Sequence, residues 1–246
     1  MFRHRGQKRT FRHNIRLAML LCLTAGFVNA SGFLGFMVLT TNVTGHAALL
    51  AVKLTEGDLR SVRMIGLWLI LFLAGAFLSS LYISKAGHDN PYAYSIPVIV
   101  EIIILVLVGY FGYSFDNTIV KTEYFAGSLL FAMGMQNALV SIVSGSVVRT
   151  THLTGMFTDL GIDLAAALLK PTSNYSFIWR KIELRIIIIT FFLAGGIIGG
   201  FVFVKLRYHS FYLAAGFLVI AMFYDFFRVK VKRIQSKVRK MTIVRD

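Results

Sequence analysis

The stretch AMGMQNALVSIVSGSVVRTTHLTGMFTDLGIDLAAALL, residues 132–169, runs from an apolar helix through a short break rich in Gly and Thr into a second apolar helix. Residues 25–54, AGFVNASGFLGFMVLTTNVTGHAALLAVKL, follow the same plan. The copies share an Asn in the first helix, two Thr in the break and a Thr-Gly step opening the second helix: Asn29 and Asn137, Thr40-Thr41 and Thr150-Thr151, Thr44-Gly45 and Thr154-Gly155. This doubled pattern predicts a chain built from two homologous halves.

The composition is that of an integral membrane protein. Hydrophobic residues make up 57% of the chain and charged residues only 15%, and the mean hydropathy is +0.70. Several apolar runs approach the roughly 20 residues that cross a hydrocarbon core as a helix, whereas a membrane barrel would show alternating segments of about ten residues. The predicted fold class is therefore all-α: a polytopic transmembrane helical bundle with three to four membrane helices in each half and a helix break in each half.

The basic residues are concentrated at the two ends of the chain. The net charge of +15 would suggest nucleic acid as the partner of a soluble protein, but 14 of the 26 Lys and Arg lie before Leu17 or after Phe227. Such tails are typical of positive-inside anchoring beside anionic lipid headgroups. Membrane lipids are therefore the expected partners, nucleic acid is not, and both termini are predicted to be cytoplasmic.

A second match sets the boundaries of the halves. The segment LFLAGAFLSS, residues 71–80, aligns without a gap with FFLAGGIIGG, residues 191–200. The Thr-Gly steps are 110 residues apart and these segments 120 apart, so the second half carries a longer loop around residues 171–175. The predicted organisation is a basic tail at 1–16, a first membrane repeat at 17–113, a linker at 114–122, a second repeat at 123–227 and a basic tail at 228–246.

The number of membrane crossings depends on whether the short helices after the breaks span the bilayer. With six crossings, the twelve Lys and Arg outside the tails divide six and six between the two sides, whereas with eight crossings they divide eight and four in favour of the tail side. The positive-inside rule therefore favours eight. Repeats of four crossings would be parallel, and repeats of three would be inverted.

The paired breaks are the predicted substrate site. Transporters often bind solutes at discontinuous helices, whose ends present unpaired backbone groups. The Gly residues would allow close approach of the backbone, and Thr44 and Thr154 are placed as N-caps. The alternative, two tight turns in which Thr hydroxyls only satisfy the backbone, stays open. The candidate substrate-binding residues are Thr41, Thr44, Gly45, Asn137, Thr151, Thr154, Gly155 and Asp159.

The apolar segments also contain polar side chains. For Asn29, Gln136 and Asn137, hydrogen bonding to a facing helix is favoured over contact with substrate. Asp159 and Asp163 lie four residues apart on one helix face, where ionisable groups usually face a polar interior or a partner.

By the repeat offset Asp163 corresponds to Lys53, which suggests an ion pair between them and leaves Asp159 without a partner. Glu101, within the apolar run PVIVEIIILVLVGYF, is a second candidate for coupling to a proton or cation.

No enzyme signature accompanies these residues. The patterns HExxH, GxSxG and GxxxxGK[ST] are absent, and no His, Asp and Glu cluster has the spacing of a metal site. Cys22 is the single cysteine, which excludes a disulfide within the chain. We therefore expect no enzyme activity, no metal and no cofactor.

The two break motifs, AGFVNASGFL…TTNVTGHAALLA and AMGMQNALVS…VRTTHLTGMFTDLG, resemble the YoaK family of uncharacterised multi-pass bacterial membrane proteins. The resemblance extends from about residue 17 to residue 227. It implies a multi-pass protein of the bacterial cytoplasmic (inner) membrane and assigns neither reaction nor substrate.

The functional prediction is a transporter or channel for a small solute or an ion, with its site at the paired Thr-Gly breaks. The alternative is a structural or regulatory membrane protein whose breaks only shape the fold and whose basic tails bind lipid or a partner. The sequence is compatible with a homo-oligomer in either case.

Overall fold

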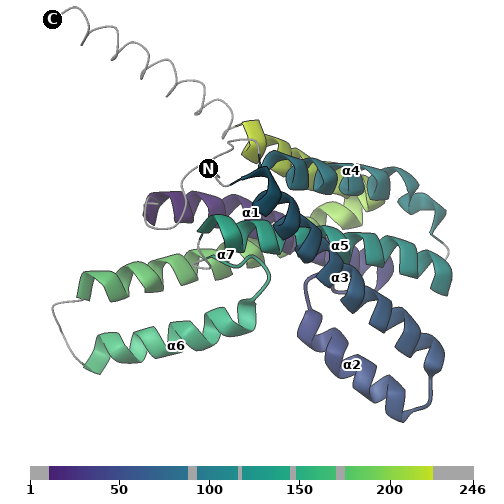
Figure 1. Cartoon of the computed structure of the whole chain (residues 1–246), viewed down its shortest axis with the longest axis horizontal. Coiled ribbons are helices and arrows are strands. Elements are labelled where there is room, and N and C mark those ends of the chain that lie inside the picture. The colour runs from purple at the N-terminus through teal and green to yellow at the C-terminus, as the bar shows by residue number, and fades with distance from the viewer. Residues whose placement is uncertain (1–10, 88–92, 116–117, 145–147, 170–174, 224–246) are drawn as a thin grey trace, which may run out of the picture.

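The structure, a computed structural model, describes residues 11–87, 93–115, 118–144, 148–169 and 175–223, which form helices joined by loops, without a strand (Figure 1). This confirms the all-α prediction. The helices are α1 (Phe11–Phe36), α2 (Val43–Thr55), α3 (Leu59–Ala86), α4 (Ser95–Phe111), α5 (Ile119–Ser144), α6 (Leu153–Leu169) and α7 (Tyr175–Leu206), with 3-10 turns η2 (Gly112–Ser114) and η3 (Arg207–His209) and a further helix at 210–223. The loop at 171–174 and the tail at 228–246 lie outside the described residues, and the tail at 1–16 and the linker at 114–122 are described in part.

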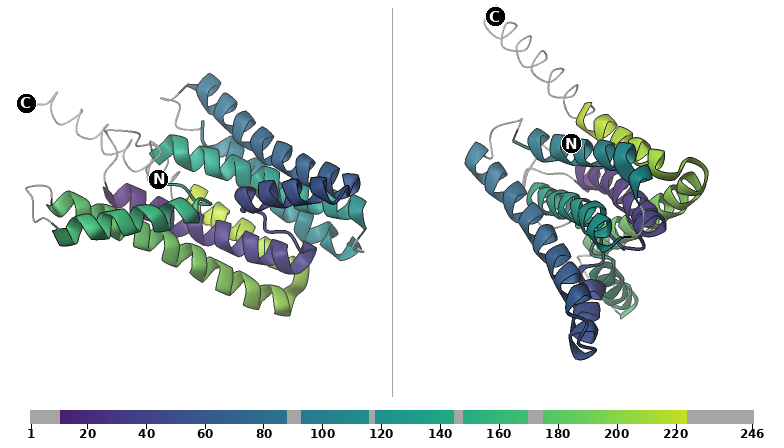
Figure 2. Two further views of the ribbon diagram at one scale, coloured as in Figure 1. Left: turned by 90° about the horizontal axis from the view of Figure 1, so that it is seen from below. Right: turned by 90° about the vertical axis from the view of Figure 1, so that its right-hand side faces the viewer.

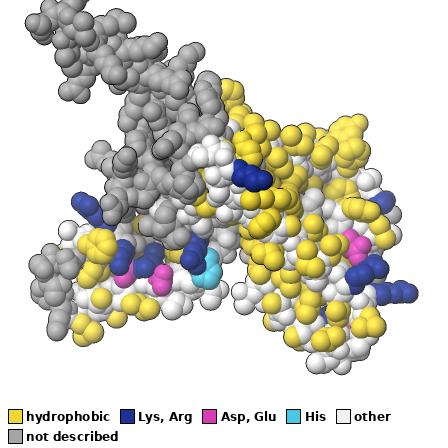
Figure 3. Space-filling view, in the orientation of Figure 1, with side chains coloured by type: hydrophobic (Ala, Val, Ile, Leu, Met, Phe, Trp, Pro, Cys, Tyr) yellow, Lys and Arg dark blue, Asp and Glu magenta, His cyan; other side chains and the backbone are white. Residues whose placement is uncertain are grey.

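Five segments of the described chain are long and apolar enough to cross a membrane: Ala18–Phe36, Leu59–Ala86, Ser95–Ser114, Val120–Ser144 and Tyr175–Phe223. The last is 49 residues long and holds two helices, because Arg207 adopts a positive φ of 50° where α7 ends. Apolar side chains are exposed along these helices (Figure 3), for example Leu73 and Phe77 on α3 and Ile197 on α7. A surface of this kind suits lipid rather than water. The protein is a multi-pass membrane protein.

The closest helix pair is α1 with α7. A Cβ on Gly26 would overlap the carbonyl oxygen of Phe192, and Gly195 in turn faces the backbone of α1. Residue numbers rise together along the pair, since Gly35 lies beside Phe203 further on, so the two helices are parallel. Small residues allow this backbone-to-backbone packing in membrane helices, where van der Waals contact replaces the hydrophobic effect as the cause of association.

The pair α3 and α5 packs in the same manner. Gly127 lies against Leu71, and a Cβ on Gly75 would overlap the carbonyl oxygen of Phe131, so these helices are also parallel. Gly134 likewise faces the backbone of α3. The long helix α3, which follows the short helix α2, is therefore packed against α5, and the long helix α7, which follows α6, is packed against α1.

The helices α1 and α5 run in opposite directions. The Gln136 side-chain amide donates to the carbonyl oxygen of Leu21 at 2.8 Å, whereas Gly32, further along α1, lies beside Leu129, earlier in α5. Gln136 therefore joins two helices, as predicted. Because α1 and α5 carry the corresponding break motifs, parallel repeats do not fit this arrangement.

The first break turns back into the membrane span. Met37 has a positive φ of 58° and ends α1, and the following residues fold back along it. The backbone N–H of Thr41 donates to the side-chain oxygen of Asn29 at 3.1 Å, about two turns before the end of α1. Consequently α2 begins near the level of Asn29, within the span Ala18–Phe36.

The helix α6 also begins within the span. It pairs with α7 through Asp159 and Arg185 and runs antiparallel to it, so its first residue, six before Asp159, is level with about Phe191 of α7. Phe191 adjoins the crossing of α7 with Gly26, near the middle of the α1 span. The two short helices then leave toward opposite ends of the bundle, paired with α3 and with α7 (Figures 1 and 2).

With 13 and 17 residues, α2 and α6 are shorter than the roughly 20 residues of a full crossing. The eight-crossing interpretation, which the loop charges favoured, therefore does not fit the structure. Half-crossing helices place Lys53 and the last residues of α6 on opposite sides, which corresponds to the even six-and-six division of basic residues. The charge rule misled because it counts residues in loops and does not detect a helix that begins inside the bilayer.

Candidate functional site

An arginine of α7 joins the two carboxylates of α6. The Arg185 guanidinium lies 3.3 Å from a carboxylate oxygen of Asp159 and contacts the Asp163 carboxylate, and it also donates to the Asp159 backbone carbonyl at 3.1 Å. The side chains of Arg185 and Asp163 are mostly buried, with 18% and 12% exposed, whereas Asp159 is 47% exposed. A planar guanidinium can serve two carboxylates at once. The arrangement fixes α6 on α7.

The predicted pair of Lys53 with Asp163 is wrong. Lys53 lies at the far end of α2 and binds Glu56 at 2.6 Å, a hydrogen bond that raises the pKa of the Lys53 ammonium. The two residues are kept apart because α2 packs on α3 and α6 packs on α7, without extensive contact between α2 and α6. The prediction that Asp159 lacks a partner is also wrong, because Arg185 of α7 pairs with it.

A cleft of about 380 Å³ opens between α6 and α7, and we call it the α6–α7 cleft. It is lined by Arg149, His152, Gly155, Met156, Asp159, Lys181, Leu184 and Arg185. On the face shown in Figure 3, basic, acidic and His side chains gather over this hairpin, while much of the neighbouring surface is hydrophobic. Two of the predicted binding residues, Gly155 and Asp159, line the cleft; three basic residues lining it were not predicted.

Two of the three cations of the cleft have no carboxylate partner among the described residues. Arg185 is paired, but Arg149 is exposed at the end of the break. The Lys181 ammonium lies 4.6 Å from the ring centre of Phe177, a cation–π contact that leaves its charge uncompensated. The cleft therefore carries an excess of positive charge.

The Thr-Gly steps have a local structural role. The side-chain oxygen of Asn42 accepts from the backbone N–H of Gly45 at 3.0 Å, so Asn42, and not Thr44, is the N-cap of α2. A Cβ on Gly45 would overlap this Asn42 side chain, and a Cβ on Gly155 would overlap the ring of His152. Glycine thus makes room for the side chain that precedes each short helix. Thr154 is likewise not an N-cap, because α6 begins at Leu153.

The buried polar groups of the breaks are partly satisfied. Asn29 accepts from the backbone of Thr41, so this amide holds the first break in place. The corresponding oxygen of Asn137 is buried without a hydrogen-bond partner in the part of the chain described. The hydroxyl oxygens of Thr40 and Thr150 are also buried without one. Unpaired buried polar atoms are costly, and they are found near both breaks.

The corresponding region of the first half is apolar. The His46 ring bonds the Leu39 carbonyl oxygen at 2.8 Å and packs edge-on against the Trp68 ring, with 5.3 Å between ring centres. The position equivalent to Asp159 is Leu49, and the one equivalent to Arg185 is Ile65. Thr41, Thr44 and Gly45 therefore do not line the α6–α7 cleft, whose charged lining residues all lie between 149 and 185 in the chain.

Glu101 is a second ionisable group away from water. It is 1% exposed on α4, which packs against α5, and its Oε1 atom has no hydrogen-bond partner among the described residues. α4 itself (Ser95–Phe111) contains no basic residue. Burying a carboxyl group without a hydrogen-bond partner is costly.

Comparisons with known proteins identify a family and a transmembrane relative. Residues 17–224 match the family described as "Protein of unknown function (DUF1275)". The chain belongs to this family. It is 28% identical over 184 residues to the UPF0700 transmembrane protein YoaK of Bacillus subtilis (strain 168), an alignment that covers 74% of this chain and 80% of that protein. No solved structure matches. The predicted family membership is confirmed, and the family name assigns no activity.

Proposed function

We propose that this member of the family is a carrier or channel for a small polar solute or an ion, and that the solute binds in the α6–α7 cleft. One observation carries the proposal: α6 begins inside the membrane span and brings ionisable side chains to a cleft beside it. Ionisable groups at such depth are costly and usually mark a solute path. Half-helices that start within the bilayer are also the usual framework of transporter sites.

We further propose that the protein consists of two homologous halves in inverted orientation, with both termini in the cytoplasm of a bacterial inner membrane. Equivalent glycine contacts support the repeat: Gly26 against Phe192 in one pair of helices corresponds to Gly134 against Phe72 in the other. The antiparallel α1 and α5 support inversion. The basic residues of both tails support the cytoplasmic assignment.

The site is single in this proposal, although the framework is doubled. The first half retains the break and the half-helix but fills the equivalent space with His46, Trp68 and apolar residues. A charged cleft is therefore needed only once, on the half that binds the solute. The first half would then supply the symmetric packing against which the second half moves or opens.

The second candidate is a structural or regulatory membrane protein. It is favoured by the side chains of Asn42 and His152, which lie over the first turns of α2 and α6 where a solute would otherwise approach the backbone. In that case the breaks are tight turns whose polar backbone groups are satisfied by side chains of the same break. This candidate gives no role to the uncompensated cations of the α6–α7 cleft.

Asp159→Asn is expected to lower solute flux at least tenfold, because it removes one of the two carboxylates that position Arg185 in the cleft, while the fold is kept because Arg185 still pairs with Asp163. Flux is measured with purified protein in liposomes, using a broad panel of small solutes and ions. Glu56→Gln, which removes a carboxylate at the opposite hairpin, is the matched control and should leave flux unchanged. Absence of flux across the panel for the wild-type protein would favour the structural candidate.

We also propose Glu101 as the coupling group for a proton. Glu101→Gln keeps the shape of the side chain but cannot ionise, so the variant is expected to fold like the wild type. In liposomes it should lose solute accumulation driven by a proton gradient and keep exchange between equal concentrations. Equal accumulation by variant and wild type would remove Glu101 from the mechanism.

A further inference from the structure

The charges of the α6–α7 cleft indicate the chemistry of its ligand. Arg185 is held by Asp159 and Asp163, which leaves it as a fixed part of the wall with its charge offset. Arg149 and Lys181 lie on the same cleft without a carboxylate partner in the described chain. Two uncompensated cations in one cleft repel each other, and a negatively charged ligand would relieve that repulsion.

The first turn of α6 adds to this positive potential. α6 has 17 residues and begins at Leu153, and its residues Gly155 and Met156 line the cleft. The amino end of a helix carries a partial positive charge and unpaired N–H groups. The potential of this helix end therefore has the same sign as that of Arg149 and Lys181, which line the same cleft.

We propose that the α6–α7 cleft binds a small oxyanion, of the carboxylate or phosphate class, between Arg149 and Lys181. The volume of about 380 Å³ is within the range of small-molecule sites. Arg149 supplies a planar fork that matches two oxygens of such an anion, and Lys181 supplies a mobile point charge. The Asp159 carboxylate also lines the cleft and would repel an anion, but its pairing with Arg185 offsets that charge.

An oxyanion can reach the cleft from two sources. Tyr175 and Trp179, whose rings are 5.9 Å apart, lie on the first turns of α7, and such aromatic residues are typical of the headgroup level. Arg185 lies six residues beyond Trp179, about 9 Å deeper along the helix. The anion is therefore either a soluble solute entering from water or the headgroup of an anionic lipid, and both offer the same chemistry to Arg149 and Lys181.

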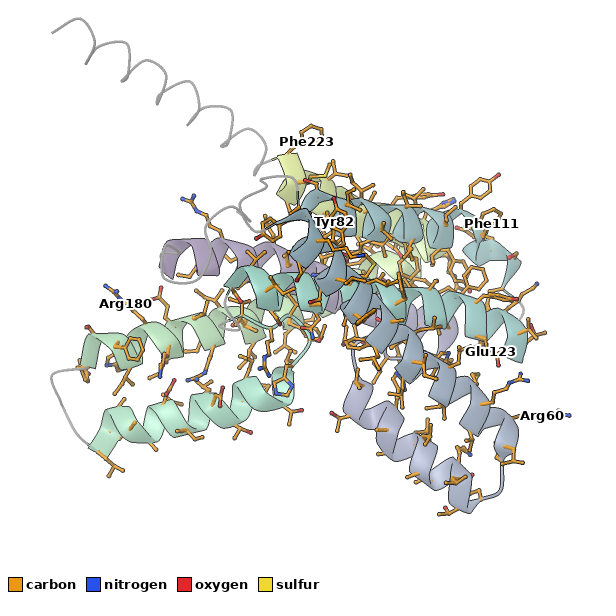
Figure 4. All side chains as sticks on the ribbon, viewed as in Figure 1. Arg60, Tyr82, Phe111, Glu123, Arg180 and Phe223 are labelled. Atoms are coloured by element: carbon orange, nitrogen blue, oxygen red, sulfur yellow. The ribbon has the colours of Figure 1, made fainter. Side chains whose placement is uncertain are left out.

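The binding test uses the purified full chain in nanodiscs of neutral lipid and titrates inorganic phosphate and acetate at constant ionic strength, with binding measured by calorimetry. The wild type is expected to bind at least one of the two anions. Arg149→Gln and Lys181→Gln should each weaken binding about tenfold, and the double variant should abolish it. Arg60→Gln on the other hairpin, which lies at the end of the bundle opposite Arg180 (Figure 4), is the control and should bind as the wild type does.

The second arm replaces part of the neutral lipid with phosphatidylglycerol. If the ligand is a lipid headgroup, this lipid should occupy the cleft and suppress phosphate and acetate binding in the wild type. Soluble anions that bind equally in both nanodiscs would assign the site to a free solute. Either outcome supports an oxyanion site, whereas wild type and double variant that are alike in both arms would overturn it.

The biological role of this anion site rests on the proposed function, but the experiments can reject the ligand class and the transport function independently. Anion binding that depends on Arg149 and Lys181, without flux in liposomes, would keep the ligand class and reject transport. Flux of a neutral or cationic solute, with no anion binding, would keep transport and reject the ligand class.

Discussion

Gly195→Ala is expected to prevent normal assembly of the bundle. The added methyl group would overlap the backbone carbonyl of Leu23, and neither helix can move aside by rotating a side chain. Forcing atoms into a packed core usually costs about 1–3 kcal/mol when side chains can adjust. At a backbone-to-backbone crossing α1 and α7 must separate, so the loss of stability should exceed about 3 kcal/mol.

The neighbouring glycine provides a matched control. A Cβ on Gly196 would approach Gly26 only to an ordinary contact distance of 3.7 Å, so Gly196→Ala should be tolerated. It can even stabilise the helix, because Ala is favoured over Gly in a helix interior by about 1 kcal/mol. Both variants are compared by size-exclusion profile and thermal unfolding in detergent.

The crossing of α3 with α5 makes the same test independently. Gly75→Ala should be as harmful as Gly195→Ala, because its methyl group would overlap the carbonyl of Phe131. Gly66→Ala, on the same helix, meets only the Leu50 side chain at 3.7 Å and is its control.

Similar behaviour of Gly195→Ala and Gly196→Ala would mean that α1 and α7 do not cross at these glycines.

Much of this architecture could be predicted from the residues. The apolar runs predicted a multi-pass helical bundle, and the repeated motifs predicted membership of the family, because both depend on composition and local order. The Thr-Gly steps correctly marked where two helices begin. Their depth could not be predicted, because it depends on a hydrogen bond from Thr41 to Asn29 that forms only when the break folds back.

The candidate site was predicted in part. Asp159 and Gly155 were selected from helix spacing and the repeat, and both line the cleft. Arg185 was missed because its distance from Asp159 in space depends on the register of α7 against α6. A signal was present: Lys181 and Arg185 are four residues apart and therefore share the face of α7 that can meet the Asp pair.

The repeat offset was misleading for charge pairing. It relates Lys53 to Asp163 as equivalent positions, but such positions touch only when they lie near a symmetry axis. Here each short helix packs on the long helix that follows it, so Lys53 and Asp163 are on opposite hairpins. Pairing had to be sought between α6 and α7.

Arg185→Leu is therefore expected to destabilise the second half strongly. It would leave the Asp163 carboxylate mostly buried, with Asp159 beside it, and no cation to offset the two charges. Removing one member of a buried ion pair typically costs about 3–5 kcal/mol, because the remaining charge cannot be solvated. The cost is measured as the shift in unfolding midpoint in detergent, relative to the wild type.

A double variant can separate the cost of the unpaired buried charge from the cost of lost packing. Arg185→Leu combined with Asp163→Leu removes both buried charges, and replacing a buried pair with apolar residues is often neutral. The double variant should therefore recover most of the stability that the single variant loses. Lys53→Leu is the control, because both members of its pair with Glu56 are more exposed, at 30% and 51%, and exposed pairs contribute little to stability.

The double variant also tests whether Arg185 binds the anion directly. If Arg185 only forms the wall of the cleft, α6 still packs on α7 in the double variant, and Arg149 and Lys181 still line the cleft. The affinity for phosphate or acetate should then stay within about threefold of the wild-type value. Loss of binding with recovered stability would instead make Arg185 a direct ligand. The ion pair with Asp163 would then be the state of the empty site, which the anion has to open.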